Sequence, residues 1–406
     1  MAGFGGLLDF VGYGVGNGDV SVSNYSPTSG DELTGARVTF TGMNLDNVTA
    51  INFLGVSSLS LVVNAAGTSL SCVCPPLRAD TADVSLVSGS GTVAAGNFTY
   101  NAVATKHQAS MKSLMTKMKE LLSLFKIEGA ELDDVQQIKR GLRPSGVFPV
   151  IYILPQSTTV LKRYSSGRFD LTNTIMISLM TKTMSKYDSQ DESLRLAKEI
   201  KRILKFYHPL QAGGYNLLVG DILVGKPSRG DTGLLRKISI PISIKTRRYQ
   251  LPTSTSQTWT ENSALDVLSQ VYNTVKSYST TDLADVNTKA WIRGATENVG
   301  SFPALVTILE DDAVVRSQRG LDDQERLFIF EIYDKLTARE NSMDSTLDIA
   351  DALMLVIWKN VNWGGVAWDS DLESVEYGQG ETERGLLSAV SLTALVNCKE
   401  ASRRTQ

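Results

Sequence analysis

The sequence has few of the residues that build catalytic or metal sites. Only two histidines occur, His107 and His208, and neither has a Cys, Asp or Glu partner at a ligand or triad spacing. The three cysteines, Cys72, Cys74 and Cys398, are too few for a disulfide framework, and we expect the first two to be buried. No phosphate-binding loop, nucleophile elbow or H-E-x-x-H pattern is present. The sequence therefore predicts a protein that is not an enzyme, with no cofactor and no metal site.

Net charge and long apolar runs are also lacking. The formal net charge of −3 gives no basic surface for sequence-directed binding of nucleic acid. No apolar run reaches the roughly 18–20 residues that cross a bilayer, so we expect no membrane partner. The apolar start, residues 1–18, has no basic residue and many glycines, which argues against a signal peptide. We interpret it as a flexible Gly-rich arm, with a first strand packed on the next domain as the alternative.

What the chain does contain is a repeat. GVFPVIYIL begins at Gly146 and GSFPALVTIL begins at Gly300. About 40 residues after each, apolar residues recur at the spacing of one buried helix face. These positions agree at a constant offset of 153: Leu194, Leu196, Ala197, Ile200, Ile203 and Leu204 in the first stretch, and Leu347, Ile349, Ala350, Leu353, Val356 and Ile357 in the second.

Further elements match on either side of these stretches. Each ends in an alternating strand, with Ile238 to Ile244 in one and Val390 to Val396 in the other. Each begins with an amphipathic helix, and in the second we expect Leu265 on the buried face. We therefore predict a tandem duplication of one α+β domain, over residues 102–250 and 255–400.

The segment before the repeat has a different composition. Residues 19–101 are rich in Ser, Thr, Gly, Asn and Val, and short alternating strands recur between turn residues, as in an all-β sandwich. The stretch VSNYSPTSGDELTGARVTFTGMNLDNVTAINFLG, followed by CPP, ADVSLVS and FTY, resembles the IPT/TIG branch of immunoglobulin-like domains. Such modules occur in transcription factors, receptors, adhesins and viral tails, so the resemblance implies a fold and no particular function.

Each copy of the repeat resembles the tail terminator (tail completion) proteins of long-tailed bacteriophages. The resembling features are a leading helix, a strand opening with Phe-Pro (Phe148-Pro149, Phe302-Pro303), a long charged hairpin, an alanine-bearing helix and two late strands. The family carries one such domain and usually no immunoglobulin-like module, and this chain departs from it in both respects. The fold class predicted is multidomain: an all-β immunoglobulin-like (IPT/TIG) sandwich followed by two duplicated α+β tail-terminator-like domains.

The resemblance implies a structural virion protein, assembled in the host cytoplasm, that forms a ring at the neck. Such a ring terminates the tail tube and joins it to the head connector. The implied partners are other copies of the chain, the tail tube protein and head–tail connector or stopper proteins, with DNA only passing through the channel. Because one chain carries two domains, three chains would make a pseudo-hexamer, which we favour over six chains. The alternatives are a tail tube or sheath-type subunit, or a surface adhesin that binds carbohydrate through its IPT/TIG module.

Several residues are candidates for contacts between subunits. Arg163 and Arg316 occupy equivalent positions in the two predicted hairpins, which suits a repeated contact between subunits. Pro241 interrupts the strand ISIPISI and predicts a sheet edge, since proline cannot donate to a strand ladder. A basic cluster ends the same strand and is either solvated or a phosphate contact: Lys245, Arg247 and Arg248.

The two alanine-bearing helices differ in charge. The first reads RLAKEIKR and contains Lys198, Lys201 and Arg202, whereas the second reads DIADAL. Opposite charge favours alternation of the two copies around a ring over like-with-like contacts. We therefore expect the basic helix of one copy to face an acidic surface of the other.

Overall fold

The computed structural model describes residues 19–401 except for 32–35, 78–79, 103–108, 142–145, 165, 184–187, 207–214, 231–232, 251–262, 285, 287–289, 295–298, 300, 319–320, 336–340, 361, 364–365, 368 and 383–384. The predicted arm, both histidines and the segment joining the two copies lie outside the described residues. The chain divides into two compact units, which are Met1–Val103 with Leu124–Asp133, and Ala104–Ser123 with Asp134–Gln406.

The first unit contains two facing β-sheets, with strand orders β1-β3-β7-β6 and β2-β9-β8-β4-β5. Alternate residues of these strands point inward, so that side chains such as Phe40, Phe53 and Phe98 form one core. Its strands and one short helix are β1 (Ser21–Ser26), β2 (Ser29–Asp31), β3 (Arg37–Met43), η1 (Leu45–Asn47), β4 (Val48–Phe53), β5 (Val56–Ser57), β6 (Leu59–Val63), β7 (Ser69–Val73), β8 (Thr81–Ser88) and β9 (Gly91–Asn101).

A segment from later in the chain belongs to this unit as well. Arg37 Nε donates a hydrogen bond of 2.8 Å to the carbonyl oxygen of Leu124, within the segment Leu124–Asp133. The expected domain over residues 19–101 therefore omits part of the unit that the contacts define. Cys72 and Cys74 lie in the core as free thiols, which confirms that they are buried.

The second unit contains both copies of the repeat. The first copy comprises α1 (Met111–Ser123), β10 (Gln137–Arg140), β11 (Val150–Arg163), β12 (Arg168–Thr183), α2 (Asp188–Phe206), β13 (Tyr215–Val219), β14 (Leu223–Val224), β15 (Ser228–Gly230) and β16 (Gly233–Tyr249). The second copy comprises α3 (Ala264–Ser277), η3 (Tyr278–Thr280), β17 (Trp291–Arg293), β18 (Ala304–Gln318), β19 (Leu321–Lys335), α4 (Asn341–Lys359), β20 (Asp369–Thr382) and β21 (Gly385–Ala401).

The two copies share strand register as well as element order. In the hairpin β11–β12 the register shifts between Pro155 and Ser157 and again between Val160 and Lys162. The hairpin β18–β19 shifts at the two corresponding places, between Leu309/Asp311 and Val314/Arg316. A short parallel strand, β10 or β17, pairs with the start of each hairpin. The helix α2 packs on β12 and β16, and α4 packs on the corresponding strands β19 and β21.

This register corrects the expected match of two arginines. Lys162 lies opposite Asp170 in the first hairpin, and Arg316 lies opposite Asp323 in the second. Arg316 is therefore the counterpart of Lys162, and the counterpart of Arg163 is Ser317. The prediction that Arg163 and Arg316 are equivalent is wrong by one residue, because the positions of the bulges fix the register.

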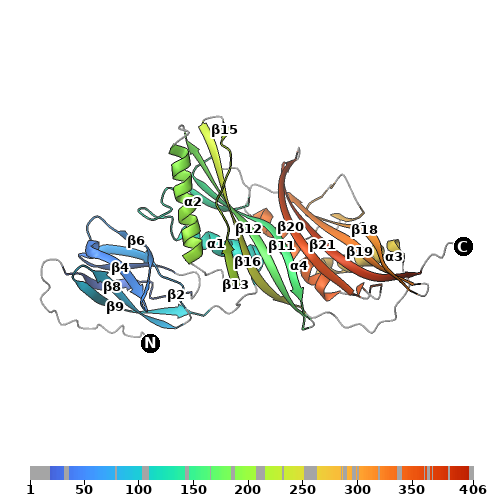
Figure 1. The fold of residues 1–406 in the computed structure, drawn as a ribbon, viewed down its shortest axis with the longest axis horizontal. Coiled ribbons are helices and arrows are strands. Elements are labelled where there is room, and N and C mark those ends of the chain that lie inside the picture. The colour runs from blue at the N-terminus through green and yellow to red at the C-terminus, as the bar shows by residue number, and fades with distance from the viewer. Residues whose placement is uncertain are drawn as a thin grey trace. The chain divides into compact units, whose positions relative to one another are not determined.

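The strands of both copies form one sheet, of 12 strands in the described part of the chain, in the order β13-β16-β12-β11-β20-β21-β19-β18-β17 (Figure 1). The strands β14 and β15 also pair with β16. The unit is therefore richer in strand than the α+β prediction implies. The copies follow each other head to tail, because β11 of the first copy pairs with β20 of the second.

Pro241 does not mark the edge of this sheet. It lies in β16 opposite Met176 of β12, and β13 and β14 flank β16 on its other side. The carbonyl oxygen of Pro241 accepts a hydrogen bond of 2.8 Å from Gly220 N, where the flanking strand is interrupted. Both backbone groups of a strand residue point to one side, so the missing N–H of Pro241 faces this interruption and leaves no ladder bond unmade.

Candidate functional site

The junction between the two copies is the candidate functional site. Ser157, Thr158 and Thr159 of β11 pair in antiparallel register with Glu376, Val375 and Ser374 of β20. The junction is heterologous, since the β11 edge of one copy meets the edge of the other copy that follows the alanine-bearing helix. A heterologous contact leaves one unpaired edge of each type at the two ends, so further copies can be added by the same contact.

Among the described residues, the ion pairs across the junction have the same polarity. Each cation comes from the first copy and each carboxylate from α4 or β20 of the second. The pairs are Lys112–Asp348, Arg140–Asp344 at 2.8 Å, Arg163–Asp369 at 3.0 Å and Arg248–Asp351 at 3.1 Å. Such complementarity fixes which faces meet and in which register.

The pair between Arg248 and Asp351 is largely enclosed, to the same extent as the pair between Arg140 and Asp344. Arg248 Nη2 lies 3.1 Å from both carboxylate oxygens, and the two side chains are 17% and 19% exposed. Burial raises the pKa of the Asp351 carboxyl above its ordinary value, although Arg248 acts in the opposite direction. Burial also raises the pKa of the nearby Tyr377 hydroxyl, and the charge of Asp351 adds to this shift. The Arg248 guanidinium therefore stabilises the ionised form of the buried Asp351 carboxyl.

Arg140 and Gly141, at the end of β10, form a second close contact. Arg140 donates to Thr116 Oγ1 of its own copy at 2.7 Å and to Asp344 Oδ2 of the other copy at 2.8 Å. Gly141 has φ +78°, and a Cβ atom there would lie 2.6 Å from the sulfur of Met343. The backbone conformation favours glycine, and a larger residue would also have to displace the end of the flexible Met343 side chain.

Apolar packing also crosses the junction. The ring of Phe169, in β12, stacks on Trp358 of α4 with centroids 4.1 Å apart. Phe169 and Leu171 belong to the same buried cluster as the core of the second copy. Tyr377 also approaches Thr158, with 3.4 Å between the two hydroxyl oxygens. The copies therefore share a core, and the junction is a permanent interface.

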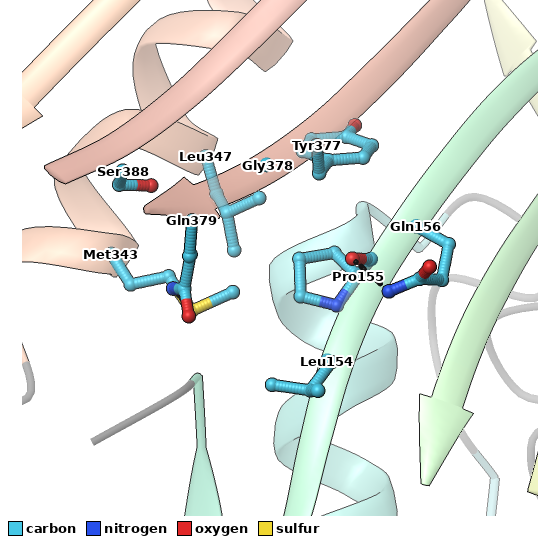
Figure 2. A pocket seen from close by; sticks show the side chains of 9 residues that line it. All are labelled: Leu154, Pro155, Gln156, Met343, Leu347, Tyr377, Gly378, Gln379 and Ser388. Carbon is cyan, nitrogen blue, oxygen red and sulfur yellow. Dashed lines mark hydrogen bonds between the residues drawn. The ribbon is translucent and has the colours of Figure 1, made fainter. Parts of the chain in front are cut away.

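Figure 2 shows a small cavity in this junction, about 50 Å³ in volume. Its walls come from both copies, and Gln379 Nε2 lies 3.2 Å from Met343 Sδ. Ligand pockets are typically about 300–1,000 Å³, so this space suits at most a water molecule or two. The lining residues are Leu154, Pro155, Gln156, Met343, Leu347, Tyr377, Gly378, Gln379 and Ser388.

The structure separates the predicted contact residues. Arg163 and Arg248 lie at the junction, and the interpretation of Arg248 as a solvated or phosphate-binding residue is wrong. Arg247 lies 3.4 Å from Asp170, within the first copy. The others are placed as follows: Lys198 exposed on α2, Lys201 paired with Asp221, Arg202 paired with Glu199, and Lys245 opposite Thr172 in the sheet.

Sequence reasoning missed Lys112, Arg140 and the carboxylates that they bind. One signal was available, since Asp344, Asp348 and Asp351 recur at helical spacing along one face of α4. Within the described ranges, no helix is long and apolar enough to cross a bilayer, and no cluster of three His, Cys, Asp or Glu side chains could hold a metal ion.

Comparison with known proteins adds the identity of the first unit. Residues 21–100 match the IPT/TIG domain family, in agreement with the two facing sheets of this segment. This segment is an IPT/TIG domain. The prediction of an immunoglobulin-like IPT/TIG fold at the front of the chain is thus confirmed. No curated protein matches the chain.

Several solved structures with local similarity come from Bacteroides. An auxiliary nutrient binding protein from Bacteroides thetaiotaomicron is 24% identical, over 23% of this chain and 24% of that chain, with a TM-score of 0.17. SGBP-B of a mixed-linkage glucan utilization locus from Bacteroides ovatus is 14% identical, over 34% and 35%, with a TM-score of 0.15. SGBP-B of a xyloglucan utilization locus from Bacteroides uniformis is 8% identical, over 57% and 67%, with a TM-score of 0.18. These scores are too low to support an argument about function, and none of these proteins is a phage tail protein.

Proposed function

We propose that this protein is a ring-forming structural subunit of a tailed bacteriophage, of the kind that terminates the tail tube at the neck. The head-to-tail junction of the two copies is the observation that supports it. In the described part of the chain, β13–β15 lie at one end of the sheet and β17 lies at the other. A chain that already joins two copies heterologously can join further copies by the same contact, and such contacts close into a ring when their rotation permits.

In this proposal three chains present six copies of the domain to a six-fold tube. The residues act by packing and charge complementarity, and no catalytic step is involved. The IPT/TIG domain decorates the ring, and DNA passes through the channel. Tail tube and connector proteins would bind the two open faces of the ring.

The test is the mass of the purified full chain together with electron microscopy. The proposal expects closed rings of three 44.1 kDa chains that cap isolated tail tubes in an addition experiment. A monomer at all accessible concentrations, or rings that never bind the ends of tubes, would contradict it. Open filaments would contradict the terminating role while leaving the head-to-tail contact in place.

A carbohydrate-binding surface protein that uses its IPT/TIG domain is the second candidate. Two similar Bacteroides structures are SGBP-B proteins of a mixed-linkage glucan and a xyloglucan utilization locus. Saturable binding of mixed-linkage glucan or xyloglucan oligosaccharides in calorimetry would favour it. In the described part of the domain, the exposed large apolar side chains are Met43, Leu54 and Val56, all of them aliphatic.

A further inference from the structure

We infer that the two outer edges of the sheet bind each other in neighbouring chains, and that Arg293 of one chain pairs with Asp191 of the next. This inference rests on the proposed ring and names the contact that closes it. The partner is a second copy of this chain, and the template is the junction between the copies within one chain.

Arg293 is the counterpart of Arg140, and its surroundings repeat. Arg140 ends the parallel strand β10 and donates to Thr116 Oγ1 at 2.7 Å. Arg293 ends the parallel strand β17 and donates to Ser269 Oγ at 2.7 Å. Arg140 makes one further contact, with Asp344 of the second copy. Arg293 is exposed, so its outer face is available for an equivalent carboxylate.

Asp191 is the counterpart of Asp344. The helices α2 and α4 align at the offset of 153, since Leu196, Ala197 and Ile200 are buried like Ile349, Ala350 and Leu353. Under this alignment Asp344 corresponds to Asp191, which is exposed on α2. Among the described residues no carboxylate pairs with Arg293, and one is present at the matching place on the other edge of the sheet.

Two positions near Arg293, Gly294 and Leu265, are also uncovered where their counterparts in the first copy contact α4. Gly141 and Gly294 both have positive φ, and each donates its N–H to the carbonyl oxygen of the residue that lies opposite the preceding arginine, Ile153 and Thr307 respectively. A Cβ on Gly141 would strike Met343, whereas a Cβ on Gly294 would meet nothing within 4 Å. Leu265 corresponds to Lys112, which binds Asp348, and is 74% exposed. The surface that touches α4 in the first copy is therefore built again in the second and left uncovered.

The strand edges match in the same way. Ser157–Thr159, the segment of β11 that pairs with β20, corresponds to Asp311–Ala313 of β18, and β17 pairs with an earlier part of the same side of β18 as β10 does with β11. On the opposite edge, Leu223 lies opposite Ser239 as Glu376 lies opposite Ser391. The first copy exposes three aliphatic side chains along this edge: Leu218, Leu223 and Val224. A neighbouring β18 would cover the free edge as β11 covers β20.

Of the remaining counterpart pairs, one also has opposite charges, with the signs reversed. Register places Glu400 of β21 at the position of Arg248, and helix alignment places Lys198 at that of Asp351. In the contact between chains the acidic residue would thus lie on β21 and the basic residue on α2, the reverse of the internal pair, in which the cation is on β16 and the carboxylate on α4. A copy therefore discriminates between its covalent neighbour and its neighbour in the next chain, which prevents the edges from pairing in the wrong order.

Charge reversal in the full chain tests the inference. We expect Arg293→Glu and Asp191→Arg each to raise the concentration at which the assembly half-dissociates by about tenfold, measured by sedimentation velocity at low salt. The combined variant Arg293→Glu/Asp191→Arg should restore assembly to within about threefold of the parent. Arg202→Glu is the matched control, because Arg202 lies on the same helix and pairs with Glu199 of its own chain.

Circular dichroism melting of each variant checks that the fold is intact. If the single variants failed to assemble because they misfold, combining the two substitutions would not restore assembly. Rescue by the combined variant would therefore indicate a direct contact between the two residues. Parent rings that both single reversals leave unaffected would overturn the edge contact and leave the ring intact. A parent chain that stays monomeric would overturn the proposed function together with this inference.

Discussion

Replacing Arg248 by alanine should destabilise the second unit by about 2–3 kcal/mol at pH 7. Breaking a fully buried ion pair costs about 3–5 kcal/mol, whereas exposed pairs contribute about 0–1 kcal/mol. Both side chains here are about one fifth exposed, which places the loss between these limits but nearer the buried one. Urea unfolding followed by far-UV circular dichroism measures it. Arg202→Ala, at an exposed pair on α2, should cost less than about 0.5 kcal/mol.

The loss should depend on pH in a defined direction. The pKa of Asp351 is raised in the folded protein, mainly by burial. Between the unfolded and folded pKa values, the folded protein binds more protons, so stability falls as the pH rises through that window. Removing Arg248 raises the folded pKa further and extends the window upward. The gap between variant and parent should therefore shrink as the pH falls from about 7 to about 4.

A second substitution provides the control for this reasoning. Asp351→Asn removes the charge that Arg248 neutralises, so Arg248→Ala should cost less in that background than in the parent. Equal costs in both backgrounds, or a gap that does not change with pH, would refute the account of Asp351 as a buried carboxylate held by Arg248.

Two further predictions concern other parts of the chain. Gly141→Ala should lower the free energy of unfolding by about 2–3 kcal/mol, from backbone strain at positive φ and the displacement of the flexible Met343 side chain, whereas Gly294→Ala should cost only the backbone strain of about 1–2 kcal/mol. Equal losses in denaturant titrations would contradict the close approach. Burial raises the pKa of Cys72 to about 12 and that of Cys74 to about 11, so both thiols should react with iodoacetamide at pH 8 at least about a hundredfold more slowly in folded than in unfolded protein. Rapid labelling without unfolding would show that the sandwich opens locally.

The buried pattern of the repeat was predictable because hydrophobic periodicity reports burial directly. The positions around Ala197 and Ala350 lie at one offset in the sequence and are buried alike in the structure. Leu265 shows the limit of this reasoning. It was expected on the buried face of α3, but Val267, Val271 and Val275 form that face, because a stripe of valines at i, i+4 spacing shifts the helix phase.

The junction itself could not be read from the sequence. Acidic residues on α4 and basic residues on α2 indicated complementary surfaces, but the bases that bind α4 come from α1, β10 and β16. The order of strands in the sheet decides which strand edges pair, and local sequence patterns do not report that order. Pro241 was misread for the same reason, since a break in the neighbouring strand protects it in the interior of the sheet.

The covalent link between the two copies has a consequence for assembly kinetics. Half of the contacts in a ring of six domains would already exist when each chain has folded, at an effective concentration that dilution cannot lower. Closure then requires the meeting of three bodies rather than six, so the yield of rings falls less steeply as subunits become scarce. Disassembly would open only alternate contacts, and its smallest product would always be a two-domain chain.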